Sequence, residues 1–225
     1  MEQLTMDNLF SAILREDVDA LLGLFSGGEA RLNMPSFGLV SNNRIFAMLV
    51  KKIANRFRYL NVSAHHLNTQ RGDNFLVAEY VLGYLFYDEE RGKNIAYDTP
   101  TALLCELDGN GKIAMMNVYT GFDAFVGRDV IRPAMYNARN ELWNVMPAAV
   151  REAYEQDDQG RYEPCHVFSA GNRFFVEENA LFTKGEICTP QAHLSAFVLG
   201  EDGSVERRYN YGAIVWEFKL WPTLY

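Results

Sequence analysis

Two adjacent histidines, His65 and His66, are the side chains of this sequence best suited to proton transfer near neutral pH. They lie in a stretch that we expect to be a β-strand, where neighbouring residues point to opposite faces of a sheet. Only one of them can then face an interior, so a two-histidine metal site is not expected. We place His66 inside because a similar segment later in the chain has His166 at the matching position. A core histidine with a satisfied hydrogen bond would explain this recurrence nearly as well.

Glu79 is a carboxylate in an otherwise apolar predicted strand, residues 75–82, and Glu178 is its counterpart in the later segment. A carboxylate buried there would be costly without a partner, and burial would raise its pKa towards the range of a general base. The alternative is that Glu79 lies on an exposed face of the sheet, or in a seam between the two similar segments, paired with a basic residue.

Other polar and aromatic side chains could bind a substrate near these groups. Tyr119 and Asn117, on a later predicted strand, could orient a substrate oxygen, as hydroxyls and amides do for developing oxyanions. The aromatic content of 13% implies that most tyrosines pack in a core or an interface. The remaining candidates for substrate contact are Asn33, Met34, Tyr80 and Tyr84.

An internal similarity predicts two structural units. Residues 66–79 resemble residues 166–178 with one residue dropped, and Tyr119 falls on Tyr211. In both copies, turns rich in Gly and Asn separate β-branched and aromatic runs, which favours an antiparallel meander of at least three strands. We therefore expect two domains whose meanders superpose with Glu79 over Glu178. Their bounds are 1–125 and 126–225.

The first copy begins with helices. Apolar residues recur at helical spacing over residues 6–25, with a break before Asp17, which can cap a second short helix. An extended piece at 30–34 leads to a third helix, which we expect Ser41 to cap. The predicted buried stripe of that helix is Ile45, Met48, Leu49 and Ile53.

Strands make up the rest of the first copy, and the whole order predicts an α+β fold. A curved sheet should wrap around the helices and leave a pocket at its open end. The predicted strands are residues 60–70, 75–87, 99–107 and 112–120.

Residues 15–25 resemble the second helix of the SnoaL-like branch of the nuclear-transport-factor-2-like (NTF2-like) superfamily, with its pattern x-x-D-x-D-A-L-x-x-L. The extended segment before Pro35, the histidine after the third helix and the strand 74–80 also fit, so the resemblance covers residues 5–125. It implies two NTF2-like cones in tandem, each with helices packed on a curved antiparallel sheet. These motifs are hydrophobic patterns, which identify a fold rather than a reaction.

The second copy departs from the family pattern. Residues 128–160 are predicted to be helical, but Pro133 and Pro147 interrupt them and no Asp-x-Asp-Ala-Leu-Leu segment occurs. This copy keeps the sheet and shortens the helical layer. Because members of the superfamily often dimerise through their sheets, the resemblance implies an intramolecular pseudo-dimer with a degenerate second copy, and it leaves further homo-oligomerisation open.

Charge and motifs exclude several classes of function. The net charge of -8 and pI near 5.1 argue against nucleic acid or an anionic membrane as partner, because both require a basic face. Without a signal sequence or a membrane-length apolar run, we expect a cytoplasmic protein. The three cysteines lack metal spacing and an even number, which favours reduced, packed thiols. No phosphate loop, nucleophile elbow or metalloprotease motif occurs, so no cofactor or metal is expected.

The resemblance implies a cofactor-independent cyclase, dehydratase or isomerase of the SnoaL-like type. Its substrate would be a small apolar carbonyl or hydroxyl compound such as a polyketide, steroid or terpenoid. In this mechanism His66 would shuttle a proton, Glu79 or a tyrosine would orient it, and Tyr119 with Asn117 would hold the oxyanion. The alternative is a non-catalytic small-molecule-binding or protein-interaction module, because a fold does not fix a function. An open cavity with His66 near a second titratable group would favour the enzyme, and a filled cone would favour the module.

Because only the first copy keeps all three helices, we predict that the working site lies in residues 5–125. Replacing His66 by Gln should lower turnover by roughly 100-fold to 10,000-fold, the usual contribution of a general acid or base, and leave the fold intact. The same change at His166 should cost little activity. Steady-state kinetics of both variants, with circular dichroism as the fold control, would check this, and equal losses at the two positions would contradict it.

Overall fold

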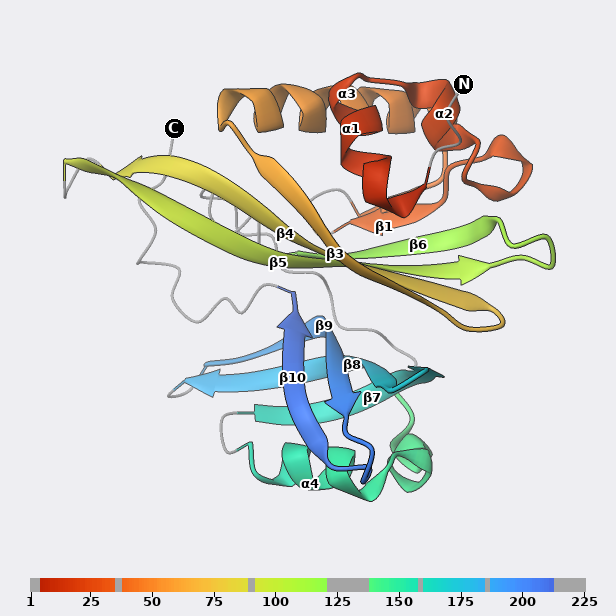
Figure 1. Ribbon diagram of the computed structural model, residues 1–225, viewed down its shortest axis with the longest axis vertical. Helices are drawn as coiled ribbons and strands as arrows, with labels where there is room; N and C mark the ends of the chain where they lie inside the picture. Colours follow the sequence, from red (N-terminus) through yellow and green to blue (C-terminus); the bar gives the residue numbers. More distant parts are fainter. Residues whose placement is uncertain are drawn as a thin grey trace. The chain divides into compact units, whose positions relative to one another are not determined.

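The computed structural model describes residues 5–34, 38–88, 92–120, 138–157, 160–184 and 187–212 (Figure 1). By its internal contacts the chain divides into two compact units, Met1–Val118 and Tyr119–Tyr225. In each unit, helices pack on one face of a largely antiparallel sheet. The predicted α+β class, with two helix-on-sheet units in tandem, is confirmed. No helix within the described ranges is long and apolar enough to cross a membrane.

The helices of the first unit follow the predicted order. They are η1 (Met6–Asn8), α1 (Leu9–Leu14), α2 (Val18–Leu22), η2 (Ser26–Gly28) and α3 (Asn43–Tyr59). The predicted break is present, because Glu16 has a left-handed φ of 56° and ends the first helical stretch. Asp17 then caps α2, with its carboxylate accepting a hydrogen bond from the Ala20 amide at 3.2 Å.

The start and the buried face of α3 differ from the prediction. Asn42, not Ser41, caps the helix, because its side chain accepts hydrogen bonds from the first backbone amides at 2.9 and 3.2 Å. Ile45 and Met48 are 53% and 66% exposed. The helix is rotated so that two phenylalanine rings are buried in their place, which removes more apolar surface from water. The buried residues are Phe46, Leu49, Val50, Ala54 and Phe57.

The sheet of the first unit has six strands in the order β2-β1-β6-β5-β4-β3. Their bounds are β1 (Leu32–Met34), β2 (Gly38–Val40), β3 (Ser63–Arg71), β4 (Phe75–Asp88), β5 (Lys93–Leu107) and β6 (Ile113–Thr120). Strands β3, β4 and β5 pair antiparallel, whereas β1 pairs parallel with β6. Figure 1 shows α1, α2 and α3 over one face of this sheet.

Aromatic side chains occupy the space between the helices and β4. Phe10 of α1 stacks on Phe57 of α3 with ring centroids 5.8 Å apart, and it meets Tyr80 of β4 edge-on at 4.9 Å. The Tyr80 hydroxyl donates a hydrogen bond to the Met6 carbonyl at 2.5 Å. This part of the first unit is therefore a packed core.

The second unit has a thinner helical layer. It consists of η4 (Asn140–Val145) and α4 (Ala148–Glu155), and residues 121–137 of the predicted helical stretch lie outside the described residues. The sheet has the order β10-β9-β8-β7 and is antiparallel throughout. Its strands are β7 (Gly160–Ala170), β8 (Arg173–Lys184), β9 (Ile187–Leu199) and β10 (Val205–Tyr211). The core residues are Leu142, Met146, Val150 and Tyr154 packed against Phe174, Val176 and Phe197.

A β-bulge in the first hairpin sets which side chains face the helices. His66 of β3 pairs with Tyr80 of β4, but the next pair along is Asn68 with Glu79, so Leu67 is an extra residue. Tyr80 belongs to the core under the helices, and its strand neighbour Glu79 therefore faces the other side of the sheet.

The second hairpin carries a bulge in the same place. Pro164 of β7 pairs with Glu178 of β8, and the next pair is His166 with Glu177, so Cys165 is the extra residue. Glu178 lies on the same face as Val176, which belongs to the core under α4.

The two bulges correct the correspondence predicted from the sequence. Glu79 is equivalent to Glu177, and the residue equivalent to Glu178 is Tyr80. His66 likewise corresponds to Pro164 and not to His166. The similarity of the letters aligned the histidines directly, but the strand pairing defines equivalence by position relative to the bulge. The turn between the paired strands comprises residues 72–75 in the first hairpin and only 171–172 in the second, so an alignment of letters does not follow the register.

We predict that replacing Asn42 by Ala will lower the free energy of unfolding of the first unit by about 1 kcal/mol, because two backbone amides of α3 lose their acceptor. Ser41→Ala is the matched control and should have almost no effect. Native-state hydrogen exchange of the β4 amides, which are buried in this unit, would measure both. A larger loss from the Ser41 change would contradict the assigned cap.

Candidate functional site

His66 lies on the helix-covered side of the first sheet and is half-buried, whereas His65 is exposed. The Nε2 atom of His66 is 2.7 Å from Thr69 Oγ1, and the His66 ring approaches the ring of Tyr80 with centroids 5.3 Å apart. Burial raises the pKa of Tyr80 well above its ordinary value, so this phenol stays protonated. The structure thus brings together two of the predicted site residues, His66 and Tyr80.

Glu79 does not join them. It is buried on the opposite face of β4, where the Asn68 amide donates a hydrogen bond to its carboxylate at 3.4 Å. A carboxylate on that face cannot orient the imidazole of His66. The part of the expected mechanism that pairs these two residues is therefore not supported by the geometry.

The other predicted contacts are spread over the first sheet. Asn33 and Asn117 are register partners on β1 and β6, and both are half-buried. Met34 packs against the core, Tyr84 is buried on β4, and Tyr119 is the buried penultimate residue of β6. Asn33 and Asn117 are the second predicted pair that the structure places side by side.

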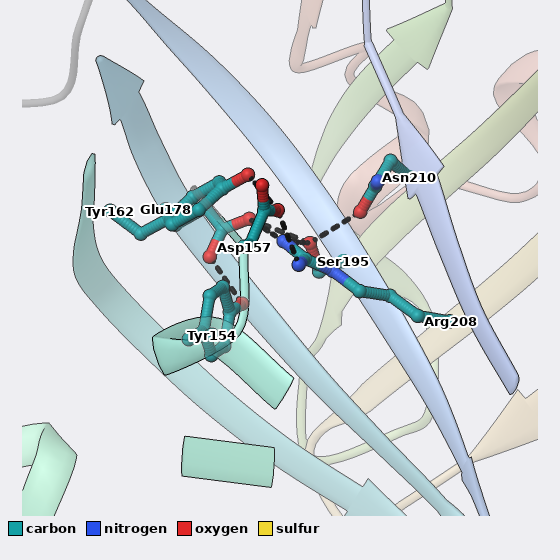
Figure 2. A network of polar contacts seen from close by, with 7 residues as sticks. All are labelled: Tyr154, Asp157, Tyr162, Glu178, Ser195, Arg208 and Asn210. Carbon is teal, nitrogen blue, oxygen red and sulfur yellow. Dashed lines mark hydrogen bonds and ion pairs between the residues drawn. The ribbon is translucent and has the colours of Figure 1, made fainter. Parts of the chain in front are cut away.

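A denser cluster of polar groups lies in the second unit, around the carboxyl group of Glu178 (Figure 2). Glu178 is 1% exposed. Its Oε2 accepts a hydrogen bond from the Tyr154 hydroxyl of α4, and its Oε1 accepts one from Ser195 Oγ of β9 at 2.6 Å. Both carboxylate oxygens are thus bound by hydroxyl groups that reach them from different elements.

Ser195 links the buried carboxyl to a residue at the surface. Its Oγ also lies 2.9 Å from Oδ1 of Asn210, which is exposed on β10. A hydroxyl has only one proton, so Ser195 can donate to Asn210 when Glu178 is protonated, or to Glu178 when that carboxyl is ionised. The chain of groups Glu178, Ser195 and Asn210 can therefore accommodate both protonation states.

The guanidinium of Arg208 fills the space beside this carboxyl. Its carbon Cζ lies 4.5 Å from the ring centroid of Tyr154, 4.9 Å from that of Tyr162 and 5.4 Å from that of Phe197. Contacts at these distances are attractive because a cation is drawn to the face of an aromatic ring.

Two carboxylates flank the same guanidinium. Arg208 Nη1 donates to Asp157 Oδ2 at 2.9 Å, and Nη2 is 3.9 Å from Glu178 Oε1. The Tyr162 hydroxyl donates to the same Asp157 oxygen at 2.5 Å. The Nε atom of Arg208 is buried, and it has no hydrogen-bond partner among the residues that the structure describes.

Strand register explains why these residues meet. Arg208 pairs with Phe197 and Asn210 pairs with Ser195 across β10 and β9, so their side chains share one face. Val176 pairs with Ser195 across β9 and β8, which adds Glu178 to that face two residues along. A register shift between Val205 and Arg207 lies just before Arg208. This is the face that α4 covers.

The buried position controls the protonation of Glu178. Burial raises the pKa of this carboxyl to about 7, although hydrogen bonds from Ser195 and Tyr154 and the charge of Arg208 act in the opposite direction. Burial and the neighbouring Glu178 raise the pKa of Tyr154 well above its ordinary value. Burial and the hydrogen bond to Asp157 raise that of Tyr162 to about 12. At neutral pH Glu178 is thus divided between its two forms while both phenols keep their protons.

A second buried carboxylate, Glu177, lies on the other face of β8 and is paired with a histidine. His166 Nδ1 is 2.6 Å from Oε2 of Glu177, whose side chain is 2% exposed. Asn68 and Glu79 occupy the equivalent positions in the first unit. Neither pair belongs to the helix-covered face.

Sequence reasoning noted Glu178 only as the counterpart of Glu79 and missed its partners Tyr154, Ser195 and Arg208. One signal was available, because two successive glutamates in an apolar strand must point to opposite faces. One of them then lies under the helices and requires hydrogen-bond donors there. Within the described ranges, no group of three or more His, Cys, Asp or Glu side chains could hold a metal ion.

Comparison with known proteins finds similarity at the level of structure. No family model matches the chain, and neither does any curated protein sequence. An NTF2-like protein of unknown function from Cytophaga hutchinsonii is 16% identical, covers 52% of this chain and 99% of its own length, and has a TM-score of 0.36.

Two further solved structures illustrate the same range. A protein from Jannaschia sp. CCS1, named for SnoaL-like polyketide cyclases, is 16% identical over 55% of this chain and 91% of its own, with a TM-score of 0.38. A protein with a ketosteroid isomerase-like fold from Catenulispora acidiphila, in complex with trimethylamine, is 18% identical over 48% and 78%, with a TM-score of 0.36. At these identities the similarity assigns no function.

The raised pKa of Glu178 predicts that the second unit loses stability as the pH rises. Below the ordinary pKa of 4.5 the carboxyl is protonated in both folded and unfolded chains, and its full contribution is present. Between that pH and about 7 only the unfolded chain ionises, so the free energy of unfolding should fall by about 3 kcal/mol. In Glu178→Gln this fall should be absent. Native-state hydrogen exchange of the β8 amides across this pH range would measure it.

The comparison with Glu178→Gln is needed because other titratable or charged groups surround the carboxyl. They are Tyr154, Asp157, Arg208 and His193, the last being its cross-strand neighbour on β9. Glu155→Gln, at an exposed position of α4, is the matched control and should keep the wild-type pH dependence. The same fall in wild type and Glu178→Gln would show that Glu178 does not cause it.

Proposed function

We propose that this chain is a cofactor-independent acid/base catalyst that moves a proton on a small carbonyl or hydroxyl compound, with Glu178 as the proton-exchanging group. The observation that carries the proposal is the buried Glu178 carboxyl, whose pKa of about 7 lies at physiological pH. A general acid or base works best when its pKa is near the working pH, because both forms are then available.

The neighbours of Glu178 are suited to the rest of such a reaction. Tyr154 keeps its proton over the whole neutral range. When that proton is not donated to Glu178, the hydroxyl can donate a hydrogen bond to a substrate oxygen on which negative charge develops. Arg208 adds a fixed positive charge on the same side of the sheet. Ser195 offers a route by which the carboxyl exchanges its proton with the surface at Asn210.

The substrate class remains the one implied by the resemblance to SnoaL-like proteins, a small apolar polyketide, steroid or terpenoid. His66 stays a separate candidate in the first unit, since its imidazole is half-buried beside Thr69 and Tyr80. The predicted pseudo-dimer and cytoplasmic location likewise stay predictions.

A second candidate function is a binding module without chemistry. Two observations favour it. Phe10, Phe57 and Tyr80 fill the space beneath the helices of the first unit, and Arg208 fills the space beside Glu178 in the second. A filled interior leaves less room for a substrate at either candidate base.

Deuterium incorporation from D2O into cyclohexanone, acetophenone and acetylacetone, followed by NMR, would separate these functions. We expect wild type to accelerate exchange of at least one ketone, with a rate that rises with pH around 7 as Glu178 ionises. Glu178→Gln should lower this rate by roughly 100-fold to 10,000-fold. The control Glu155→Gln should match wild type.

His66→Gln, measured in parallel, assigns the reaction to one unit. If His66→Gln abolishes exchange and Glu178→Gln does not, the catalytic group lies in the first unit and the proposal for Glu178 is wrong. Absence of exchange by wild type, together with saturable binding of the same ketones, would favour the binding module. Circular dichroism of each variant excludes loss of the fold as the cause.

A further inference from the structure

The space beside Glu178 has the composition of a cation-binding site, and the chain's own Arg208 occupies it. We propose that the second unit recognises a planar organic cation, a guanidinium or amidinium group, and that Arg208 competes for this site from β10. The inference concerns binding and holds whether or not Glu178 catalyses a reaction.

Three aromatic rings form the apolar part of the site. Tyr154 lies at its centre, with its ring centroid 4.9 Å from that of Tyr162 and 5.3 Å from that of Phe197. The centroids of all three rings lie within 5.4 Å of the Arg208 guanidinium carbon. Aromatic faces attract a cation, and a planar guanidinium can also stack on them.

Carboxylates supply the charge that such a ligand needs. Asp157 accepts a hydrogen bond from one guanidinium nitrogen at 2.9 Å, and Glu178 lies 3.9 Å from the other. The Asp157 side chain is 22% exposed and that of Glu178 is 1% exposed, so the pair extends from the surface into the interior.

Arg208 does not satisfy the site completely. Its Nε is buried without a hydrogen-bond partner among the described residues, which is unfavourable for an N–H group. A guanidinium that enters from solvent, rather than on a side chain anchored to β10, can direct its donors differently. This difference gives an external cation a means of competing.

The position of Arg208 in the sheet makes its displacement feasible. Among the residues that the structure describes, β10 is an edge strand of its sheet and pairs only with β9. The register shift between Val205 and Arg207 directly precedes Arg208, and irregularities of this kind weaken the ladder locally. An edge strand can release one side chain while β7, β8 and β9 keep their pairing.

Ethylguanidinium is the probe for this proposal, titrated into Arg208→Ala and wild type and followed by calorimetry and by the tyrosine ring resonances. We expect saturable one-to-one binding to Arg208→Ala. Binding to wild type should be between roughly 10-fold and 1,000-fold weaker, because the site is open only when Arg208 has left it. Ethylammonium should bind Arg208→Ala more weakly than ethylguanidinium does, since it lacks the planar fork.

Two control variants connect the binding to this site. Arg207→Ala removes an exposed arginine next to Arg208 and should bind the probe no better than wild type. The double change Arg208→Ala with Glu178→Gln should bind it less tightly than Arg208→Ala alone, because one acidic partner has lost its charge.

Each remaining outcome decides the question. A folded Arg208→Ala variant that shows no saturable binding of ethylguanidinium overturns the proposal. So does wild type that binds the probe less than roughly 10-fold more weakly than Arg208→Ala does. If Arg208→Ala unfolds, refolding on addition of ethylguanidinium, but not of ethylammonium or urea, supports the site, and failure to refold rejects it. Because no turnover is measured, these results are independent of whether Glu178 exchanges protons with a ketone.

Discussion

A carboxyl group placed in an apolar interior is the constraint around which the second unit is organised. Glu178 sits under α4, where an unpaired charge would cost several kcal/mol, so each of its oxygens has a hydroxyl donor. One donor comes from the helix and the other from the neighbouring strand. The carboxyl therefore ties α4 to β9 as well as occupying β8, and the helical layer of this unit is attached through a polar centre as well as an apolar one.

The first unit solves the same position differently. Tyr80, the residue equivalent to Glu178, is a neutral phenol whose hydroxyl needs a single acceptor and finds the Met6 carbonyl. The rest of its ring packs against Phe10. The same position thus holds an aromatic core residue, Tyr80, in the first hairpin and an ionisable one, Glu178, in the second. The phenol has one hydrogen-bond partner there and the carboxyl has two.

The order of elements could be predicted from the sequence because it depends on local patterns. Asp17 after a break in apolar periodicity marks a helix start. The predicted strands of the first unit lie within a few residues of the observed ones, except that β5 begins earlier and β2 was not predicted. The rotation of α3 could not be predicted, since burying Phe46 in place of Ile45 depends on the sheet that the helix meets. Helical spacing alone allows both faces.

The candidate site around Glu178 could not be predicted either, because it also depends on how distant segments pair. A bulge adds one residue to a strand without any turn residue that would mark it in the sequence. The bulge in β7 changes which residue of that strand lies opposite each of the two adjacent glutamates of β8. Arg208 and Ser195 come from strands whose pairing is long-range, so their meeting with Glu178 follows from register and not from spacing in the sequence.

Pro164, opposite Glu178, has a consequence for the solubility of the protein. Within the described part of the chain β7 is an edge strand. The Pro164 carbonyl accepts a hydrogen bond from the Arg139 amide at 2.8 Å, so it points away from β8. The nitrogen of the same residue points to the same side of the strand and carries no hydrogen. An incoming strand from another molecule would therefore find neither a donor nor a vacant acceptor at this point of the edge. The residue that faces the buried carboxyl thus also protects the sheet against edge-to-edge aggregation.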